Sequence, residues 1–229
     1  MHSLSLLHLL HLCDSTLPIG SFSHSAGLET YVQEKIITNK IEAKEFVTEQ
    51  LSQNLYYTDA AIVSLTYDAA QSHNFNEILS LDEICNAVKL PMEIRAASNK
   101  LGIRLLKIFE KNEAAILPGK YKEAITKNDA SGHFCIALAL LAAAMNINKD
   151  EMLAGFYYNA ASGFVTNAVK LIPLGQQDGQ EILMSLFPLI KDLAQKSLSP
   201  AKEMIGYCCA GFDIRSMQHE QLYSRLYMS

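Results

Sequence analysis

FCIALALLAAAM, residues 134–145, is the longest apolar run of the chain and the stretch that decides its fold class. The run is rich in alanine and leucine, which favour helix, and it has no polar face. A helix that is apolar on every side is buried among other elements. The run is far shorter than the roughly 18 residues that indicate a membrane span. We therefore predict a central helix over residues 133–146, with its neighbours packed closely around it.

The sequence on either side of this run carries start signals for further helices. Residues 39–42, 80–83 and 148–151 each place a capping residue three positions before a glutamate, a spacing that satisfies backbone N–H groups of a first turn. Ser199 and Pro200 give a fourth signal, a cap followed by a proline at the first helical position. Apolar residues recur at helical spacing after these signals, and strand-like alternation is nearly absent.

The breaks between the expected helices are short, and none has the length or composition of a linker. They fall at residues 18–20, 73–74, 91, 118–119, 128–132, 173–179 and 211. The chain shows no internal repeat of solenoid length. The sequence therefore predicts an all-α fold, a single compact bundle-like domain of about nine or ten helices over residues 1–229.

Composition restricts the classes of partner. Apolar residues make up 49% of the 229 residues and charged residues only 19%, which indicates that another protein covers part of the surface. The formal net charge is −5, and Lys and Arg form no block. The sequence therefore predicts neither nucleic acid nor a membrane as a partner.

The cysteines and the N-terminus favour a cytoplasmic protein. The odd number of cysteines and the lack of a CxxC pair argue against a disulfide framework and a structural zinc site, so we expect reduced thiols. The cysteines are Cys13, Cys85, Cys135, Cys208 and Cys209. Residues 1–13 are rich in leucine but lack the basic region and the cleavage site of a signal peptide.

The sequence carries no complete catalytic or nucleotide-binding motif, so we predict no catalytic residue and no cofactor. Gly20 and Gly27 flank a serine-rich loop, but this loop is no phosphate loop, because no Gly-Lys-Ser/Thr follows it. Ser23, His24 and Ser25 resemble a nucleophile elbow without its first glycine or its preceding strand. A helical hydrolase that uses these three residues is the alternative from another functional class.

Metal ligation is also not expected from this chain alone. His8 and His11 are three residues apart, but they alternate with leucines and fit the polar edge of an amphipathic helix. Cys208 and Cys209 are adjacent and would point about 100° apart on a helix. His219 begins an HExxH-like pattern that has a tyrosine in place of the second histidine.

The C-terminal tail, residues 213–229, is too rich in apolar and aromatic side chains for a solvated segment. Tyr and Arg are enriched in interface hot spots, so we predict that Tyr223, Arg225 and Tyr227 bind a partner protein. On this interpretation the tail is mobile in the free protein and becomes ordered in the complex. The alternative is a last helix docked on the protein's own core.

The stretch CDSTLPIGSFSHSAGLE, residues 13–29, concentrates turn-forming residues in a short connection and indicates a fixed shape. We predict a helix over residues 22–34 whose exposed side offers Phe22, His24 and Glu29 to a partner. An ordinary corner between two helices explains the same residues.

Four segments together carry a family resemblance. DSTLPIGSFSHSAGLE and QHEQLYSRLYMS are similar to the two ends of the urease accessory protein F family, and PMEIRAASNKLGIR at 91–104 and NAVKLIPLGQQDGQ at 167–180 lie between them in the same order. The resemblance implies an all-α homodimer that works with a D-type accessory protein, called H in some systems, and a G-type GTPase on apo-urease. It implies an adaptor that regulates GTP-dependent nickel insertion and supplies no catalytic side chain.

The resemblance also assigns roles to single residues. Phe22 and Arg225 match positions that in the family engage the D-type partner, and Tyr158, in FYYNAASGF, matches a position at the dimer interface. Leu17 stands where phenylalanine is more frequent, a conservative change. A helical scaffold for another client remains a third hypothesis.

Overall fold

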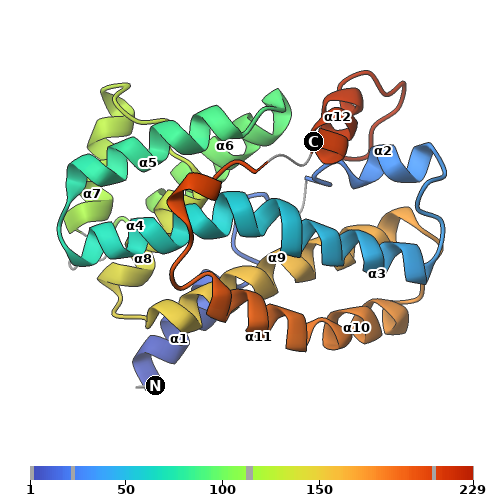
Figure 1. Ribbon diagram of the computed structural model, residues 1–229, viewed down its shortest axis with the longest axis horizontal. Coiled ribbons are helices and arrows are strands. Elements are labelled where there is room, and N and C mark those ends of the chain that lie inside the picture. The colour runs from blue at the N-terminus through green and yellow to red at the C-terminus, as the bar shows by residue number, and fades with distance from the viewer. Residues whose placement is uncertain (1–2, 22–23, 112–115, 208–209, 229) are drawn as a thin grey trace.

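The computed structural model describes residues 3–21, 24–111, 116–207 and 210–228. Helices are the only regular elements in these four ranges, which confirms the all-α prediction (Figure 1). In chain order the α-helices are α1 (Ser3–Leu12), α2 (Leu28–Gln33), α3 (Lys40–Glu49), α4 (Ala61–Gln71), α5 (Phe75–Val88), α6 (Met92–Ile108), α7 (Ile116–Thr126), α8 (Phe134–Ala144), α9 (Lys149–Leu171), α10 (Gln176–Ser185), α11 (Phe187–Lys196) and α12 (Ala210–His219). A π-helix, η2 (Gln50–Ala60), joins α3 to α4, and a 3-10 turn, η3 (Lys202–Met204), precedes α12.

The central helix is α8, as its all-apolar sequence predicts. Every residue from Cys135 to Ala142 is buried, and α8 packs chiefly on α4 and α6. Gly102 of α6 lets the two helices approach closely, because a Cβ at this position would clash with the backbone of Gly132 and His133. Ridges of small residues, here mostly alanine, allow such close helix packing.

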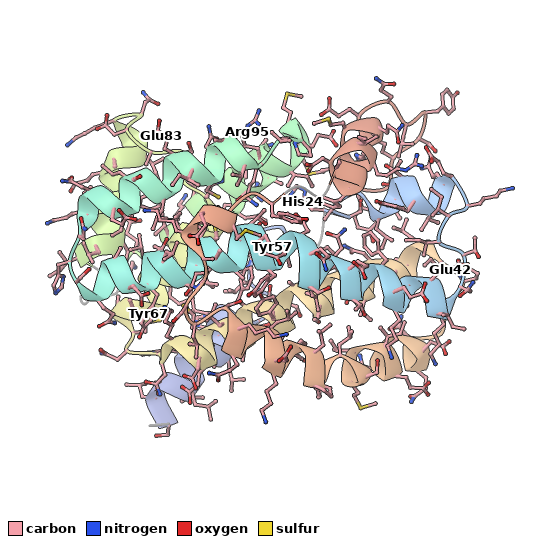
Figure 2. All side chains as sticks on the ribbon, viewed as in Figure 1. His24, Glu42, Tyr57, Tyr67, Glu83 and Arg95 are labelled. Carbon is pink, nitrogen blue, oxygen red and sulfur yellow. The ribbon has the colours of Figure 1, made fainter. Side chains whose placement is uncertain are left out.

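The long helix α9 carries a second layer. It packs against α10 and α11 on one side and against α3 and η2 on another (Figure 1). Polar side chains fix the corners between the layers (Figure 2). The Tyr67 hydroxyl of α4 donates to the carbonyl of Ile147 at 2.8 Å, and the Arg95 guanidinium of α6 donates to the carbonyl of Lys89 at 2.8 Å.

Some helix boundaries differ from the sequence prediction. Asn39 caps α3 as expected, with its side chain accepting from the N–H groups of Ile41 and Glu42. Ser80 lies inside α5 and caps nothing, because the side chain of Asn74 already accepts from an N–H of the first turn of that helix. The predicted breaks at 118–119 and 211 also fall within helices, α7 and α12.

The N-terminal helix α1 is largely uncovered. Of its residues only Leu12 is buried, and four leucines are exposed, namely Leu4, Leu6, Leu7 and Leu10. Within the described ranges, no helix combines the length and the apolar character that a membrane crossing requires.

Candidate functional site

The C-terminal segment lies against the chain's own N-terminal region. Helix α12 packs beside α2 and near the first turn of α6 (Figure 1). Its own residue Phe212 is buried. After α12 the chain continues without regular structure to residue 228 and returns along α2. There the Gln33 amide donates to the carbonyl of Ser224 at 2.9 Å. Two segments that sequence analysis singled out as partner-binding are therefore neighbours in the fold.

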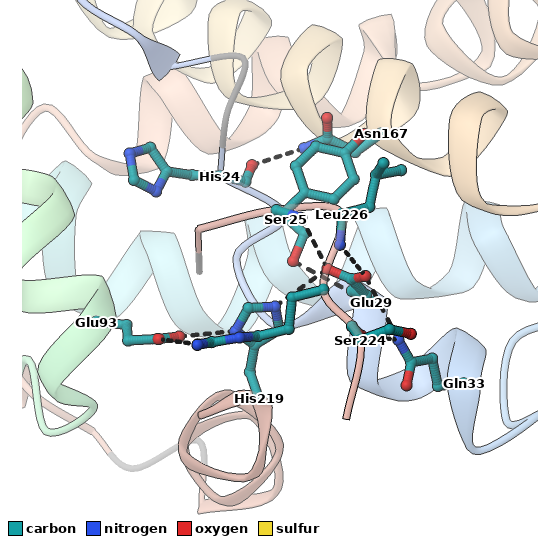
Figure 3. Close-up of polar contacts among 11 residues, drawn as sticks. His24, Ser25, Glu29, Gln33, Glu93, Asn167, His219, Ser224 and Leu226 are labelled. Carbon is teal, nitrogen blue, oxygen red and sulfur yellow. Dashed lines mark hydrogen bonds and ion pairs between the residues drawn. The ribbon is translucent and has the colours of Figure 1, made fainter. Parts of the chain in front are cut away.

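Glu29 holds the end of the tail in place (Figure 3). Its carboxylate accepts hydrogen bonds from the backbone N–H of Leu226 at 2.7 Å and of Tyr227 at 3.1 Å, while the residue is only 2% exposed. The same carboxylate lies 3.1 Å from Nε2 of His219. A buried carboxylate is stable only when donors replace its water, and here two backbone N–H groups of the tail do so, with the His219 ring nitrogen as a third polar contact.

His219 connects Glu29 to a second acid. Its ring is fully buried, and Nδ1 lies 2.7 Å from the carboxylate of Glu93 in α6. Because each ring nitrogen faces a carboxylate, the imidazole can donate at both only when it carries two protons. Arg225 donates to the other oxygen of Glu93 at 2.8 Å. We term these contacts the C-terminal anchor. Its members are Glu29, Glu93, His219, Arg225 and the N–H groups of Leu226 and Tyr227.

A strained turn before α2 sets the direction of Glu29. Ala26 and Gly27 both have positive φ values, 51° and 82°. Positive φ is rare for alanine and ordinary for glycine, and a Cβ on Gly27 would lie 2.7 Å from Oγ of Ser216 in α12. The amide of Asn167 in α9 donates to the carbonyl of His24 at 2.8 Å and holds the start of the turn. The turn thus brings α2 and α12 into contact.

A cavity of about 200 Å³ lies beside the anchor, between η2, α6 and α12. Lys89 and Asp59 line it as a buried ion pair at 2.7 Å. Burial disfavours the Lys89 ammonium, but the Asp59 carboxylate and the neighbouring Cys85 and Cys135 together outweigh this effect, and the pKa of Lys89 is raised. His24 also lines the cavity, and desolvation followed by the charges of Lys100 and Arg104 lowers its pKa.

The structure corrects two expectations about the N-terminal segment. The helix begins at Leu28 and not at residue 22, because the Ala26–Gly27 turn interrupts it. Glu29 faces the interior, where it binds the tail, and does not belong to an exposed helix face. His24 is half-buried at the cavity, and Phe22 lies outside the described residues.

The structure places the tail against the chain itself, whereas the sequence predicted a tail that is mobile in the free protein. Residues 213–228 are docked on the chain itself, which is the alternative arrangement considered from the sequence. Within the tail the three predicted partner-binding residues differ in exposure. Tyr227 is 7% exposed, the side chain of Arg225 is 41% exposed, and Tyr223 is fully exposed. The pairing with Glu29 and Glu93 was not visible in the sequence, because the anchor joins residues more than 100 positions apart.

The predicted dimer residue lies on another face. Tyr158 of α9 is 42% exposed, and its ring centroid lies 6.3 Å from that of Phe187, which begins α11. Met184 and Phe187 are themselves about half exposed, at 53% and 48%. Three large apolar side chains are therefore partly uncovered in this region.

Two further candidates from the sequence, His11 and Ser25, have structural contacts in the fold. The ring of His11 packs edge-on against Phe109, with centroids 5.0 Å apart. Ser25 is fully buried, with Oγ 3.5 Å from the backbone nitrogen of Glu29. Ser23, Cys208 and Cys209 lie outside the described residues. In the part of the chain that is described, no three His, Cys, Asp or Glu side chains cluster as metal ligands would.

Comparison with known proteins identifies a single family. The UreF family model matches residues 37–187. The urease accessory protein UreF of Actinobacillus pleuropneumoniae serotype 5b (strain L20) is 48% identical over 221 residues, 96% of this chain and 97% of that protein. The protein of that name from Haemophilus influenzae (strain PittEE) is also 48% identical, over 96% of this chain and 94% of its own length. That from Bacillus sp. (strain TB-90) is 35% identical over 98% of this chain and 99% of its own length.

Proposed function

We propose, from the premise that this chain belongs to the UreF family of urease accessory proteins, that it is an adaptor in urease maturation. The adaptor joins the D- or H-type accessory protein to the G-type GTPase on apo-urease and regulates GTP-dependent nickel insertion. It acts in the cytoplasm as a homodimer and supplies no catalytic side chain or resident cofactor. The nickel ion is the cargo of the assembly.

The observation that carries this proposal is the exposed surface around the C-terminal anchor. Five apolar side chains of this surface are exposed although the segment itself is docked. They are Ile214 (54%), Met217 (42%), Tyr223 (105%), Leu226 (69%) and Met228 (58%). An apolar patch rimmed by arginine is typical of a protein-binding site. The anchor fixes the backbone beneath these side chains, so little ordering entropy remains to be lost on binding.

The docked tail changes the mechanism that sequence analysis suggested. We propose that the D- or H-type partner binds the tail as a preformed surface and contacts Tyr223 and Arg225 directly. Tyr227 and Glu29 support this surface from inside the chain. His24 and Phe22 belong to the adjoining segment, and we assign them to the edge of the same interface.

A binding measurement with the D- or H-type protein tests this assignment. Tyr223→Ala should weaken the complex by more than about tenfold, because a hot-spot side chain contributes about 2 kcal/mol or more. Ile116→Ala on α7 is the matched control, since Ile116 is 71% exposed and α7 lies at the opposite end of the molecule (Figure 1). Equal affinities for both variants and the wild type, by isothermal titration calorimetry, would place the partner elsewhere.

Catalysis by the isolated chain is the competing hypothesis. The purified protein should hydrolyse neither GTP nor ester and peptide substrates above the buffer rate, because the chain has no nucleotide loop and no triad context. Turnover that co-purifies with the protein and disappears in Ser23→Ala or Ser25→Ala would favour the hydrolase. Pull-down of an unrelated client in place of the urease accessory proteins would favour the third hypothesis, a scaffold.

A further inference from the structure

Two cysteines on different helices form a close pair in the core. Cys85 of α5 is 1% exposed and Cys135 of α8 is fully buried, and their Sγ atoms lie 3.4 Å apart. Both are free thiols. A disulfide bond is about 2.05 Å long, so the sulfur atoms need to approach by only about 1.4 Å. The fold therefore holds two thiols at a distance from which they can be joined.

The surroundings favour a thiolate on one of the two sulfur atoms. The hydrogen bond with Cys135 lowers the pKa of Cys85 most, burial opposes it, and His133 and the charge of Lys89 lower it further. Burial, and then Cys85 itself, raise the pKa of Cys135. Cys85 is therefore the candidate nucleophile of the pair, and Cys135 is the candidate resolving thiol.

Cys13 gives an internal contrast. It is partly buried, and burial of the thiol raises its pKa to about 12. A Cβ added to Gly155 would lie 2.7 Å from its Sγ, and its own carbonyl accepts from Asn159 at 2.8 Å. A thiol of this kind stays protonated at neutral pH and reacts slowly with oxidants.

We propose that Cys85 and Cys135 are a redox-active dithiol that a peroxide oxidises to a disulfide between α5 and α8. The Cys85 thiolate attacks hydrogen peroxide, the O–O bond breaks, Cys85 becomes a sulfenic acid and the departing hydroxide takes up a proton to form water. The Cys135 sulfur then attacks Sγ of Cys85 and the S–O bond breaks. The hydroxide that leaves combines with the Cys135 proton. Two thiols and one peroxide give one disulfide and two waters.

Oxidation of the thiol pair changes the surroundings of Lys89, which lines the cavity beside the C-terminal anchor. Lys89 lies four residues after Cys85, lines that cavity and carries the ion pair with Asp59. The disulfide removes the thiolate charge that faces the Lys89 ammonium and ties the end of α5 to α8. The thiol pair is therefore a modification site connected to this cavity through Lys89, and the inference stands independently of the proposed function.

Peroxide titration of the reduced full-length protein tests the inference directly. After quenching with an alkylating agent under denaturing conditions, the wild type should lose the mass of two hydrogens and two alkylation sites. Peptide mapping should show Cys85 linked to Cys135 with Cys13 still alkylated, and dithiothreitol should reverse the change. The inference is overturned if both cysteines remain alkylated after Cys13 has reacted, or if Cys85 is linked to a different cysteine.

Single variants separate the two steps. In Cys135→Ser the sulfenic acid on Cys85 should persist and be trapped by dimedone, whereas in Cys85→Ser the Cys135 thiol should stay reduced. Cys13→Ser is the control and should form the disulfide like the wild type. Circular dichroism verifies that the buried serines are tolerated, and the wild-type mapping decides the question even if they are not. Oxidation of Cys135 at an unchanged rate in Cys85→Ser would refute the assignment of the nucleophile.

Discussion

Glu29 carries most of the polar contacts of the C-terminal anchor although it is a single carboxylate on a six-residue helix. The sequence shows only an acidic residue in the first turn of a helix, a position usually occupied for its interaction with the helix dipole. The fold gives it two backbone N–H donors and a histidine. Its partners are 190 or more positions away in the chain, and periodicity does not reveal contacts at that separation.

Replacement of Glu29 by glutamine measures the strength of the anchor. Glutamine keeps the shape but loses the charge and places an N–H₂ group where an oxygen accepted. We expect the free energy of unfolding to fall by about 3 kcal/mol, the usual cost of leaving buried donors unpaired. Urea denaturation provides the measurement. Glu110→Gln, which breaks an exposed pair with Lys122, is the control and should leave the midpoint unchanged.

His24 provides a pH-dependent test at the same scale. Its pKa in the folded protein lies below the unfolded value of about 6.5, mainly because of burial. The unfolded state therefore binds the proton more readily, and His24 makes the protein less stable as the pH falls below about 6.5. Relative to His24→Gln, the wild type should lose stability between about pH 7 and pH 5.5. A stability difference that is independent of pH over this interval would exclude the shift.

At the scale of elements, the sequence predicted helices better than it predicted their ends. The apolar run in α8 and the Asn39 cap of α3 are local signals, and both are confirmed. The start of α2 depends on Ala26 in a left-handed conformation, which alanine rarely adopts, and Ser216 of α12 packs against the next residue, Gly27. The π-helix η2 was not expected, because its sequence shows ordinary helical spacing.

Gly27 tests the turn that aligns α2 with α12. In Gly27→Ala the new Cβ meets Oγ of Ser216 and the residue must hold a φ of 82°. Both effects are unfavourable, and we expect a loss of about 1–3 kcal/mol in thermal or urea unfolding. Gly119→Ala in α7 is the matched control, because no atom lies within 4 Å of its Cβ position and the helix is regular there. This control should stabilise the protein by up to about 1 kcal/mol.

The tail itself can be followed by hydrogen exchange in the isolated protein. The amides of Leu226 and Tyr227 donate to a buried carboxylate, so they should exchange more slowly than the amide of the fully exposed Tyr223. Glu29→Gln should remove this protection without changing exchange in α8. Rapid exchange at 226 and 227 in the wild type would restore the earlier expectation of a mobile tail.

For the whole molecule, four sequence segments pointed to one family, and comparison over nearly the full length confirms it. Composition pointed to covered apolar surface, and exposed apolar side chains occur in several regions of the described chain, among them α1, the tail and the surface of α9, α10 and α11. The sequence does not show which of these surfaces binds which partner. That choice depends on distances between segments and on which side chains the fold leaves exposed.

The last prediction concerns self-association through Tyr158. Tyr158, Met184 and Phe187 expose apolar area away from the tail, and we propose that a second copy covers them in a homodimer. Tyr158→Asp would bury a carboxylate without a partner, so the dissociation constant should rise by about tenfold or more, the equivalent of 1.4 kcal/mol. Light scattering over micromolar concentrations measures this change.

Tyr223→Asp is the matched control for that experiment, because it places the same charge on an exposed tyrosine of the tail. Tyr223→Asp should leave the dimer intact and weaken binding of the D- or H-type protein. Tyr158→Asp should weaken the dimer and leave direct binding to the isolated D- or H-type protein unchanged. Opposite effects of one chemical change at two positions would separate the two surfaces. A wild-type protein that remains monomeric at high concentration would contradict the dimer, and a dimer weakened equally by both variants would contradict the placement of its interface.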